Sequence, residues 1–221
     1  DESRWHFDAN KQLRQIVSPT SLVYTYRYYG DDIGDLAEFT GKLKAVETSY
    51  GRGLLFAYYP QSSTNVYKRG LLQYVGDHTV VDIQNPQSGE RFVSFDYDEM
   101  LIEDPNNLGT FIGNDEGLLK QVKDLRDNDW GYRYYGQDMG ETDADLLNYM
   151  TAMSAPNGSD INQMDYTLST DPDYPIATIE QRLGVVNNQA LKILEFEFQY
   201  NGNNLTIEKD IASQLTTTHH Y

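Results

Sequence analysis

Three carboxylates near the C-terminus come closest to the spacing of a reactive site. Glu195 and Glu197 lie two residues apart in an alternating run, which places them on one strand face, about 7 Å apart. The following Asn201-Gly202 predicts a two-residue hairpin turn that sets Glu208 opposite Glu195. Such a face could hold a cation, or supply the acid and base of glycoside hydrolysis. We favour the simpler interpretation of a solvated hairpin face, because acid–base pairs usually face each other across a cleft.

An aromatic cluster is the most suggestive binding feature. Its members are Trp130, Tyr132, Tyr134 and Tyr135, within a Tyr- and Gly-rich stretch from 127 to 140 that we expect to be a loop. Tyr and Trp dominate interface hot spots and stack on sugar rings. They equally fill the packed side of a strand, so a protein interface and a core role both stay open.

The remaining motifs are weak. Asp127-Asn128-Asp129 begins like a calcium loop, but the fifth position is Gly131 and Asp138 replaces the closing Glu. The glycine pairs Gly51/Gly53 and Gly113/Gly117 are not followed by the further glycine or the lysine of a phosphate-binding loop. Histidine is scarce, and no catalytic triad is indicated; the four are His6, His78, His219 and His220. Sequons at Asn157 and Asn204 are expected by chance in a chain of this composition. We therefore predict no enzyme activity, no cofactor and no metal site.

Charge and composition narrow the classes of partner. The chain has 34 acidic and 17 basic residues, a net charge of −17, and no cysteine. Such a charge repels phosphate backbones and anionic lipid heads, so we expect no nucleic-acid partner. The missing cysteines exclude disulfides, thiolate zinc sites and cysteine nucleophiles. No apolar run approaches the roughly 20 residues of a membrane-spanning helix, so we expect no membrane insertion.

Apolar periodicity predicts the elements that would carry these residues. Strand-like alternation covers 22–28, 43–49, 53–59, 66–75, 80–84, 91–97 and 194–200. A four-residue loop at 76–79 would place Tyr74 opposite Val81, and the turn at Asn201-Gly202 would place Phe198 opposite Leu205. Helical spacing favours helices at 8–17, 114–125, 142–153 and 178–190. The polar stretch 154–175 is typical of a long loop, and no internal repeat is visible.

These elements predict an α+β fold, mainly antiparallel β. We expect an N-terminal helix and a small barrel-like β unit at 1–100, a helical and loop-rich insert at 101–177, and a C-terminal β-hairpin region at 178–221. The alternative that all three form one continuous domain stays open. The strand rhythm of 43–98 is similar to that of SH3-like and Sm-like barrels, a likeness of fold alone.

The function predicted from the sequence is that of a non-enzymatic structural or binding protein. Tyr-rich strands and long polar loops favour a component of a virion or cell-surface assembly, with other protein subunits as partners and an oligomeric state. The virion or the extracellular space is the favoured location, and the cytoplasm stays open. The alternative is a carbohydrate-binding or carbohydrate-active protein that uses Glu195, Glu197 and the Trp130 cluster.

Overall fold

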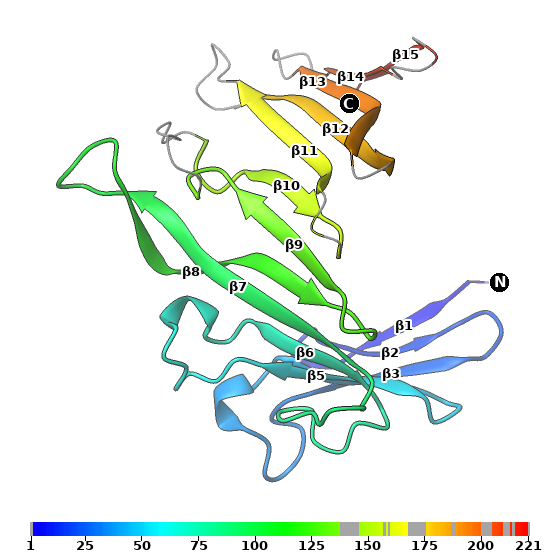
Figure 1. The fold of residues 1–221 in the computed structure, drawn as a ribbon. Coiled ribbons are helices and arrows are strands. Elements are labelled where there is room, and N and C mark those ends of the chain that lie inside the picture. Colours follow the sequence, from blue (N-terminus) through cyan, green and yellow to red (C-terminus); the bar gives the residue numbers. More distant parts are fainter. Residues whose placement is uncertain are drawn as a thin grey trace. The chain divides into compact units, whose positions relative to one another are not determined.

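The chain folds as a nearly all-β protein. The computed structural model describes residues 2–137, 146–156, 158, 160–167, 176–186, 189–199, 205–209, 213 and 215–220. Within these residues the elements are β-strands and short 3-10 turns, without an α-helix (Figure 1). The strands take their places in the sheet in chain order, from β1 to β15, and every described pairing is antiparallel. The expectation of a β-rich antiparallel fold is confirmed.

Two compact units divide the chain: 1–96 with 123–127, and 97–122 with 128–221. The first unit holds β1 (Arg4–Phe7), β2 (Leu13–Val17), β3 (Val23–Tyr28), η1 (Ala37–Phe39), β4 (Leu43–Thr48), β5 (Gly53–Tyr58), η2 (Val66–Lys68), β6 (Leu72–Asp77) and the start of β7 (Phe92–Glu103). The second holds the rest of β7, most of β8 (Phe111–Lys123), β9 (Asp129–Tyr134), β10 (Met150–Ser154), β11 (Asp160–Thr167), β12 (Ile176–Val186), β13 (Gln189–Gln199), β14 (Leu205–Lys209) and β15 (Thr216–His220).

Tight turns of one kind join several strand pairs. In each, the residue before a three-residue loop donates its N–H to the carbonyl of the residue after it, as at Asp8–Gln12, Ser18–Leu22 and Thr48–Arg52. The third loop residue is left-handed: Lys11, Ser21 and Gly51 have φ of 63°, 64° and 74°. A type I turn followed by a left-handed residue is a common three-residue hairpin connection.

A second, wider connection recurs and reveals an internal repeat. The residue after β3, β5 and β9 is in each case a tyrosine whose N–H donates to the carbonyl of the residue just before the next strand. These bonds are Tyr29 N to Lys42 O, Tyr59 N to Leu71 O and Tyr135 N to Tyr149 O. In the return bonds, Gly41, Gly70 and Asn148 donate to the same tyrosines, and all three have positive φ. The expected absence of a repeat was wrong, because the repeat lies in hairpin geometry around loops of different sequence.

The core of the first unit lies where such a loop folds back on the sheet. Phe39 of η1 is 1% exposed, and its ring lies 5.4 Å from that of Tyr29 and 5.7 Å from that of Tyr58. Ala45 and Ala57 are buried on the neighbouring strands. Edge-to-face contacts between such rings add about 0.5–1.5 kcal/mol per pair to the burial itself. The aromatic residues thus stabilise the sheet from within.

The helices expected at 8–17 and 114–125 are strands and turns. At the start of the first segment, the Asp8 carboxylate accepts the N–H groups of Asn10 and Gln12, which makes the β1–β2 turn. Asn114 likewise accepts the N–H of Glu116 within β8. Asp and Asn side chains bind local N–H groups in turns and strands as readily as at helix starts.

The two other segments predicted to be helical also contain strands. β12 runs through most of 178–190, and β10 occupies the end of 142–153. The first residues of the latter segment, 142–145, lie outside the described residues. The expected helical insert is replaced by strands where it is described. Strands also occupy parts of the two stretches expected to be loops, with β9 inside 127–140 and β11 inside 154–175.

The barrel-like closure expected in the first unit is absent from the described strands. Their order in the sheet follows the chain, and β1 pairs with β2 alone. The predicted strand at 80–84 is part of a loop after β6, where Val80 is buried and Val81 is 92% exposed. Tyr74 therefore pairs with Ser94 of β7 rather than with Val81.

The C-terminal hairpin exists, but its register differs by one residue from the prediction. β13 and β14 pair, with Phe198 opposite Thr206 and Gln199 opposite Leu205. A two-residue turn would have placed Phe198 opposite Leu205. The Asn201-Gly202 dipeptide itself lies outside the described residues.

Candidate functional site

Tyrosine hydroxyls close three hairpins by the same kind of hydrogen bond. Tyr28 donates to the carbonyl of Leu13 at 2.9 Å, and Tyr58 donates to that of Leu43 at 2.9 Å. In the second unit, Tyr134 donates to Leu119 at 2.8 Å. In every case the acceptor lies 15 residues earlier, at the far side of a tight turn. We call these three contacts the tyrosine clasps; they join residues 15 apart in different strands, and no sequence motif predicted them.

The clasp tyrosines are protonated donors. Burial raises the pKa of Tyr58 to about 12, and burial also raises the pKa values of Tyr28 and Tyr134. The Arg14 guanidinium lies 4.9 Å from the ring centre of Tyr28, and the Lys42 ammonium lies 5.1 Å from that of Tyr58. At neutral pH these phenols thus hold the sheet together and do not act as bases.

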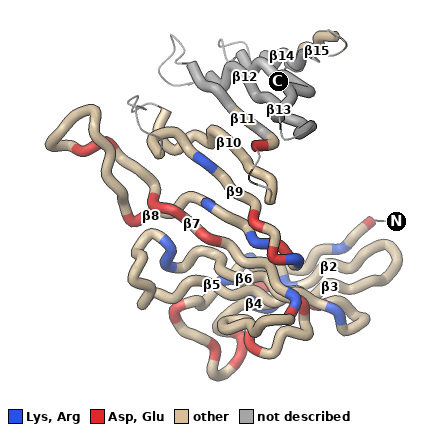
Figure 2. Tube along the Cα trace, viewed as in Figure 1, with Lys and Arg blue, Asp and Glu red and all other residues tan. Residues whose placement is uncertain are grey.

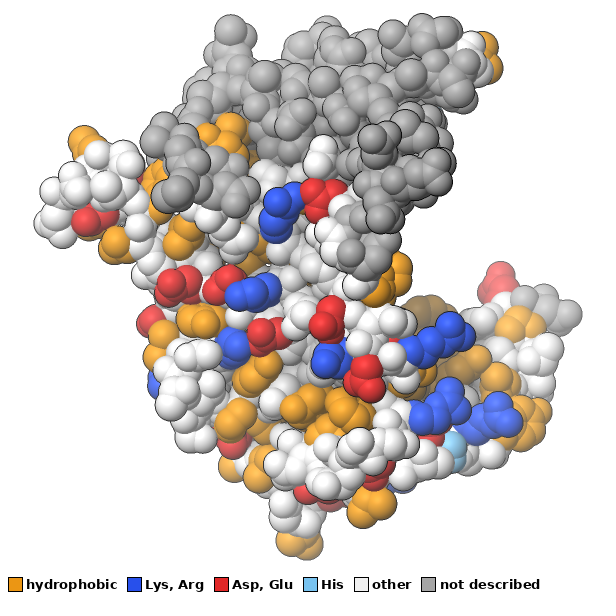
Figure 3. Space-filling model, viewed as in Figure 1, with side chains coloured by type: hydrophobic (Ala, Val, Ile, Leu, Met, Phe, Trp, Pro, Cys, Tyr) orange, Lys and Arg blue, Asp and Glu red, His pale blue; other side chains and the backbone are white. Residues whose placement is uncertain are grey.

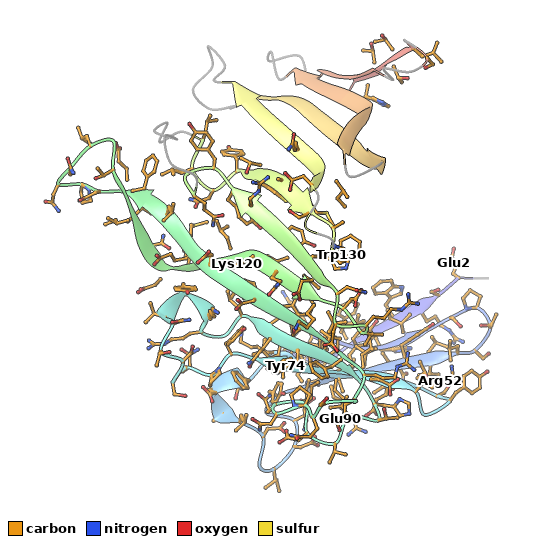
Figure 4. All side chains as sticks on the ribbon, viewed as in Figure 1. Glu2, Arg52, Tyr74, Glu90, Lys120 and Trp130 are labelled. Carbon is orange, nitrogen blue, oxygen red and sulfur yellow. The ribbon has the colours of Figure 1, made fainter. Side chains whose placement is uncertain are left out.

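The aromatic cluster predicted from the sequence is divided between β9 and the residue that follows it. Trp130, Tyr132 and Tyr134 alternate along the strand, and all three are half-buried. Figure 4 labels Trp130 in this part of the chain. Tyr134 makes a clasp, and Tyr135 opens the wide connection to β10 through its backbone. Tyr134 and Tyr135 thus have structural contacts, and the interface role of the cluster stays a prediction.

The three carboxylates are not aligned as predicted. In the β13–β14 pair, Glu195 stands opposite Lys209, Glu197 opposite Ile207, and Glu208 opposite Phe196. A one-residue change of register exchanges the residues that oppose each other. In the sheet order, three strands separate β9 from β13, so Trp130 lies about 19 Å from the glutamate strand at 4.8 Å per strand.

Carboxylates of the first unit are engaged in local structure. Arg14 pairs with Asp8 and Asp31, and Lys44 pairs with Asp32 and Asp35. The Arg14 hydrogen bond holds the pKa of Asp31 below its usual value, and the Lys44 hydrogen bond does the same for the pKa of Asp35. These acids fix the 30–36 loop against the sheet.

A pocket of about 440 Å³ lies between the loop that ends at Phe92 and the β8–β9 turn. It is lined by Ser88, Gly89, Glu90, Arg91, Phe92, Lys123, Asp124, Leu125 and Asp127. Glu90 accepts the N–H groups of Val81 and Gln87, which hold its pKa below the usual value (Figure 4). The Glu90 carboxylate thus holds the loop in place. The residues that line the pocket include no histidine that could activate Ser88.

Other polar motifs show no cation site. Asp127 takes a left-handed turn conformation before β9, and no group of His, Asp or Glu in the described part of the chain is placed to hold a metal. His78 contacts Asp77 at 3.1 Å beside the end of β6. The residues Asp138, Asn157 and Asn204 lie outside the described residues.

The outer edge of β1 is the most distinctive exposed feature of the first unit. All four residues of β1 are exposed, and Trp5 and Phe7 are each 58% exposed. Phe7 pairs with Leu13 as Tyr28 pairs with Leu43 and Tyr58 with Leu72. Phe7 therefore occupies a clasp position without a hydroxyl, at an edge to which no described strand is paired.

Comparisons with known proteins add no identity. No family model matches the chain, and no curated protein matches it. Two solved structures are similar at 10% identity and a TM-score of 0.27: "Crystal Structure of TcdB2-TccC3-Cdc42" and "Crystal Structure of TcdB2-TccC3". They cover 94% and 95% of this chain, which spans only 11% and 12% of theirs. A likeness this slight carries no argument. Within the described residues, no helix is long and apolar enough to cross a membrane.

Proposed function

We propose that this chain is a non-enzymatic structural protein, a component of a virion or cell-surface assembly that binds other protein subunits. The observation that carries the proposal is the exposed edge of β1. An unpaired strand edge presents N–H and C=O groups that another strand can bind. Monomeric proteins commonly protect such an edge with charges, proline or a covering segment. Here the exposed strand is Arg-Trp-His-Phe, whose largest side chains are apolar.

The repeat within the first unit supports a strand as the occupant. At the inner positions equivalent to Phe7, the ring of Tyr28 or Tyr58 lies over the preceding strand and its hydroxyl bonds to that strand. A strand added beside β1 would cover Phe7 in the same way. Because the side chain lacks a hydroxyl, it makes no demand for a particular acceptor on the incoming chain.

The polar groups of the site support a structural role over a catalytic one. The clasp hydroxyls bond to backbone carbonyls, and the carboxylates of Asp31, Asp35 and Glu90 bond to cations or backbone N–H groups. Groups committed in this way strengthen the fold and are poorly placed to act on a substrate.

Charge supports protein subunits as the partners. By sequence the first unit carries 14 acidic and 12 basic residues, whereas the second carries 20 acidic and 5 basic residues. The nearly balanced first unit can approach another protein closely, and the strongly acidic second unit repels nucleic acids and anionic membranes.

The test is the native mass of the chain, alone and in an extract of the cells or particles that make it. We expect sedimentation velocity to show species heavier than the 25.3 kDa chain, and we expect Trp5→Lys with Phe7→Lys to remove them. Tyr50→Lys, at an 80% exposed turn residue, is the matched control and should leave them intact. A single species of chain mass in every sample up to about 200 μM would refute the proposal.

A further inference from the structure

The end of the β7–β8 hairpin extends beyond its neighbour in the second unit. β9 ends at Tyr134, whose hydroxyl reaches Leu119, and Gly136 of the following connection lies beside Leu101 and Phe111. The base of this extension is held by Asn148, which accepts the N–H of Leu101 at 2.9 Å and donates to its carbonyl at 2.8 Å. We call residues 102–112, beyond that contact, the β7–β8 tip.

The β7–β8 tip is an ordered turn. Asp104 N donates to Thr110 O, Asn107 N to Asp104 O, and Thr110 N to Asn107 O. The carboxylate of Asp104 accepts the N–H of Asn106, and that of Glu103 accepts the N–H of Gly109. A turn closed by this many hydrogen bonds loses little conformational entropy when a partner binds it.

Apolar side chains gather on this ordered turn. Leu108 at its apex is 80% exposed, and Ile102 and Ile112 are 41% and 42% exposed. Ile102 lies two residues before Asp104 and Ile112 two residues after Thr110, on the strands that lead to the turn. Figure 3 shows hydrophobic side chains at the exposed end of this hairpin. Single exposed apolar residues are ordinary, but these three lie on one short, ordered turn and its flanks, and we call the three residues the patch.

The surroundings of the patch carry charge of one sign. From Tyr97 to Leu119 the sequence has six acidic residues and no lysine or arginine, and the acidic positions follow both strands of the hairpin (Figure 2). The first cation, Lys120, pairs with Asp98 at 3.0 Å. Glu99, Asp115 and Glu116 remain exposed around the patch. This charge repels an acidic partner and attracts a basic one.

We propose that the β7–β8 tip binds a partner protein by inserting Leu108 and its flanking isoleucines into an apolar seat bordered by lysine and arginine. This surface is separate from the β1 edge and belongs to the second unit. The proposal is therefore independent of the assembly role proposed for β1.

The probe is an 18-residue amphipathic peptide with a leucine face bordered by lysines, titrated into the full chain and followed by amide NMR shifts. We expect the largest shifts at 102–112. Leu108→Ser should weaken binding about tenfold, the value for one largely buried leucine. Leu125→Ser, at another exposed turn leucine, is the matched control and should leave the affinity unchanged.

Two control peptides separate the charge from the apolar contact. Replacing every lysine by glutamate should abolish binding, and replacing every leucine by serine should abolish the dependence on Leu108. Shifts spread over other acidic segments, or equal affinities of wild type and Leu108→Ser, would overturn the proposal. The peptide titration reads the amide signals of 102–112, whereas the assembly role is tested by the native mass of the Trp5 and Phe7 variants. A failure of one proposal is therefore distinguishable from a failure of the other.

Discussion

Replacing Tyr58 by phenylalanine removes one tyrosine clasp and little else. The ring and its contacts with Tyr29 and Phe39 remain, while the 2.9 Å hydrogen bond to the Leu43 carbonyl is lost. A hydrogen bond of this kind contributes about 0.5–1.5 kcal/mol net. We therefore expect the free energy of unfolding to fall by about 1 kcal/mol, and the melting temperature by about 2–4 °C for a chain of this size.

Urea denaturation followed by circular dichroism measures this loss. Tyr50→Phe is the matched control, because Tyr50 is 80% exposed in a turn and should change stability by less than about 0.5 kcal/mol. The clasp at Tyr28 has the same geometry, so Tyr28→Phe should cost a similar amount. If Tyr58→Phe unfolds at the wild-type urea concentration, or if Tyr50→Phe loses as much, the clasps do not stabilise the sheet.

The same clasp predicts the alkaline limit of stability. The pKa of Tyr58 is raised by burial from 10.0 to about 12. A raised pKa stabilises the fold fully below the unfolded-state value and ceases to do so as pH rises through the folded-state value. Wild type should therefore lose stability between about pH 10 and 12 more steeply than Tyr58→Phe. Absorbance at 295 nm should show one late-titrating tyrosinate fewer in the variant, and identical titrations would contradict this.

The remaining predictions concern backbone space, an ion pair and the hairpin tip. Gly53→Ala should destabilise the fold by about 1–3 kcal/mol in urea melts, because the new Cβ would lie 2.6 Å from the Val46 carbonyl oxygen; Gly131→Ala, with its nearest contact at 3.6 Å, is the tolerated control. Arg14→Gln should raise the pKa of Asp31 toward its ordinary value, as read by carboxyl-carbon NMR, so wild type should lose more stability than the variant as pH falls through that range; an unmoved pKa would refute the pairing. Asn148→Gly keeps the positive φ of 67° and removes two hydrogen bonds to Leu101, so amides in 101–112 should exchange faster; unchanged rates would show that Asn148 does not hold the tip.

Strand periodicity succeeded where side chains alternate between the two faces of the sheet. The runs at 43–49, 53–59 and 91–97 match β4, β5 and the first half of β7. It failed where apolar residues also fit a helix. Asp8 and Asn114 have the side chains of helix caps but bond to N–H groups two residues ahead. Local sequence cannot separate these outcomes, because the deciding contact is the pairing of distant strands.

In the sequence, the repeated hairpin connection is marked only by a pair of adjacent tyrosines. Two adjacent tyrosines occur at 28–29, 58–59 and 134–135, and each pair spans a strand end and the start of a wide connection. The loops that follow differ in length and composition, which hides the period. The exposure of Trp5 and Phe7 was beyond sequence reasoning for another reason, since it depends on which strand lies at the edge of the sheet.

Amide hydrogen exchange across β1 tests the central claim most directly. In the isolated chain, alternate amides of residues 4–7 should exchange fast, because one side of β1 has no described partner strand. In the native assembly those amides should become protected, as expected when a strand pairs with the edge. Tyr50, in the exposed β4–β5 turn, should exchange equally fast in both states. Equal exchange at 4–7 in the isolated chain and in its native setting would contradict the account.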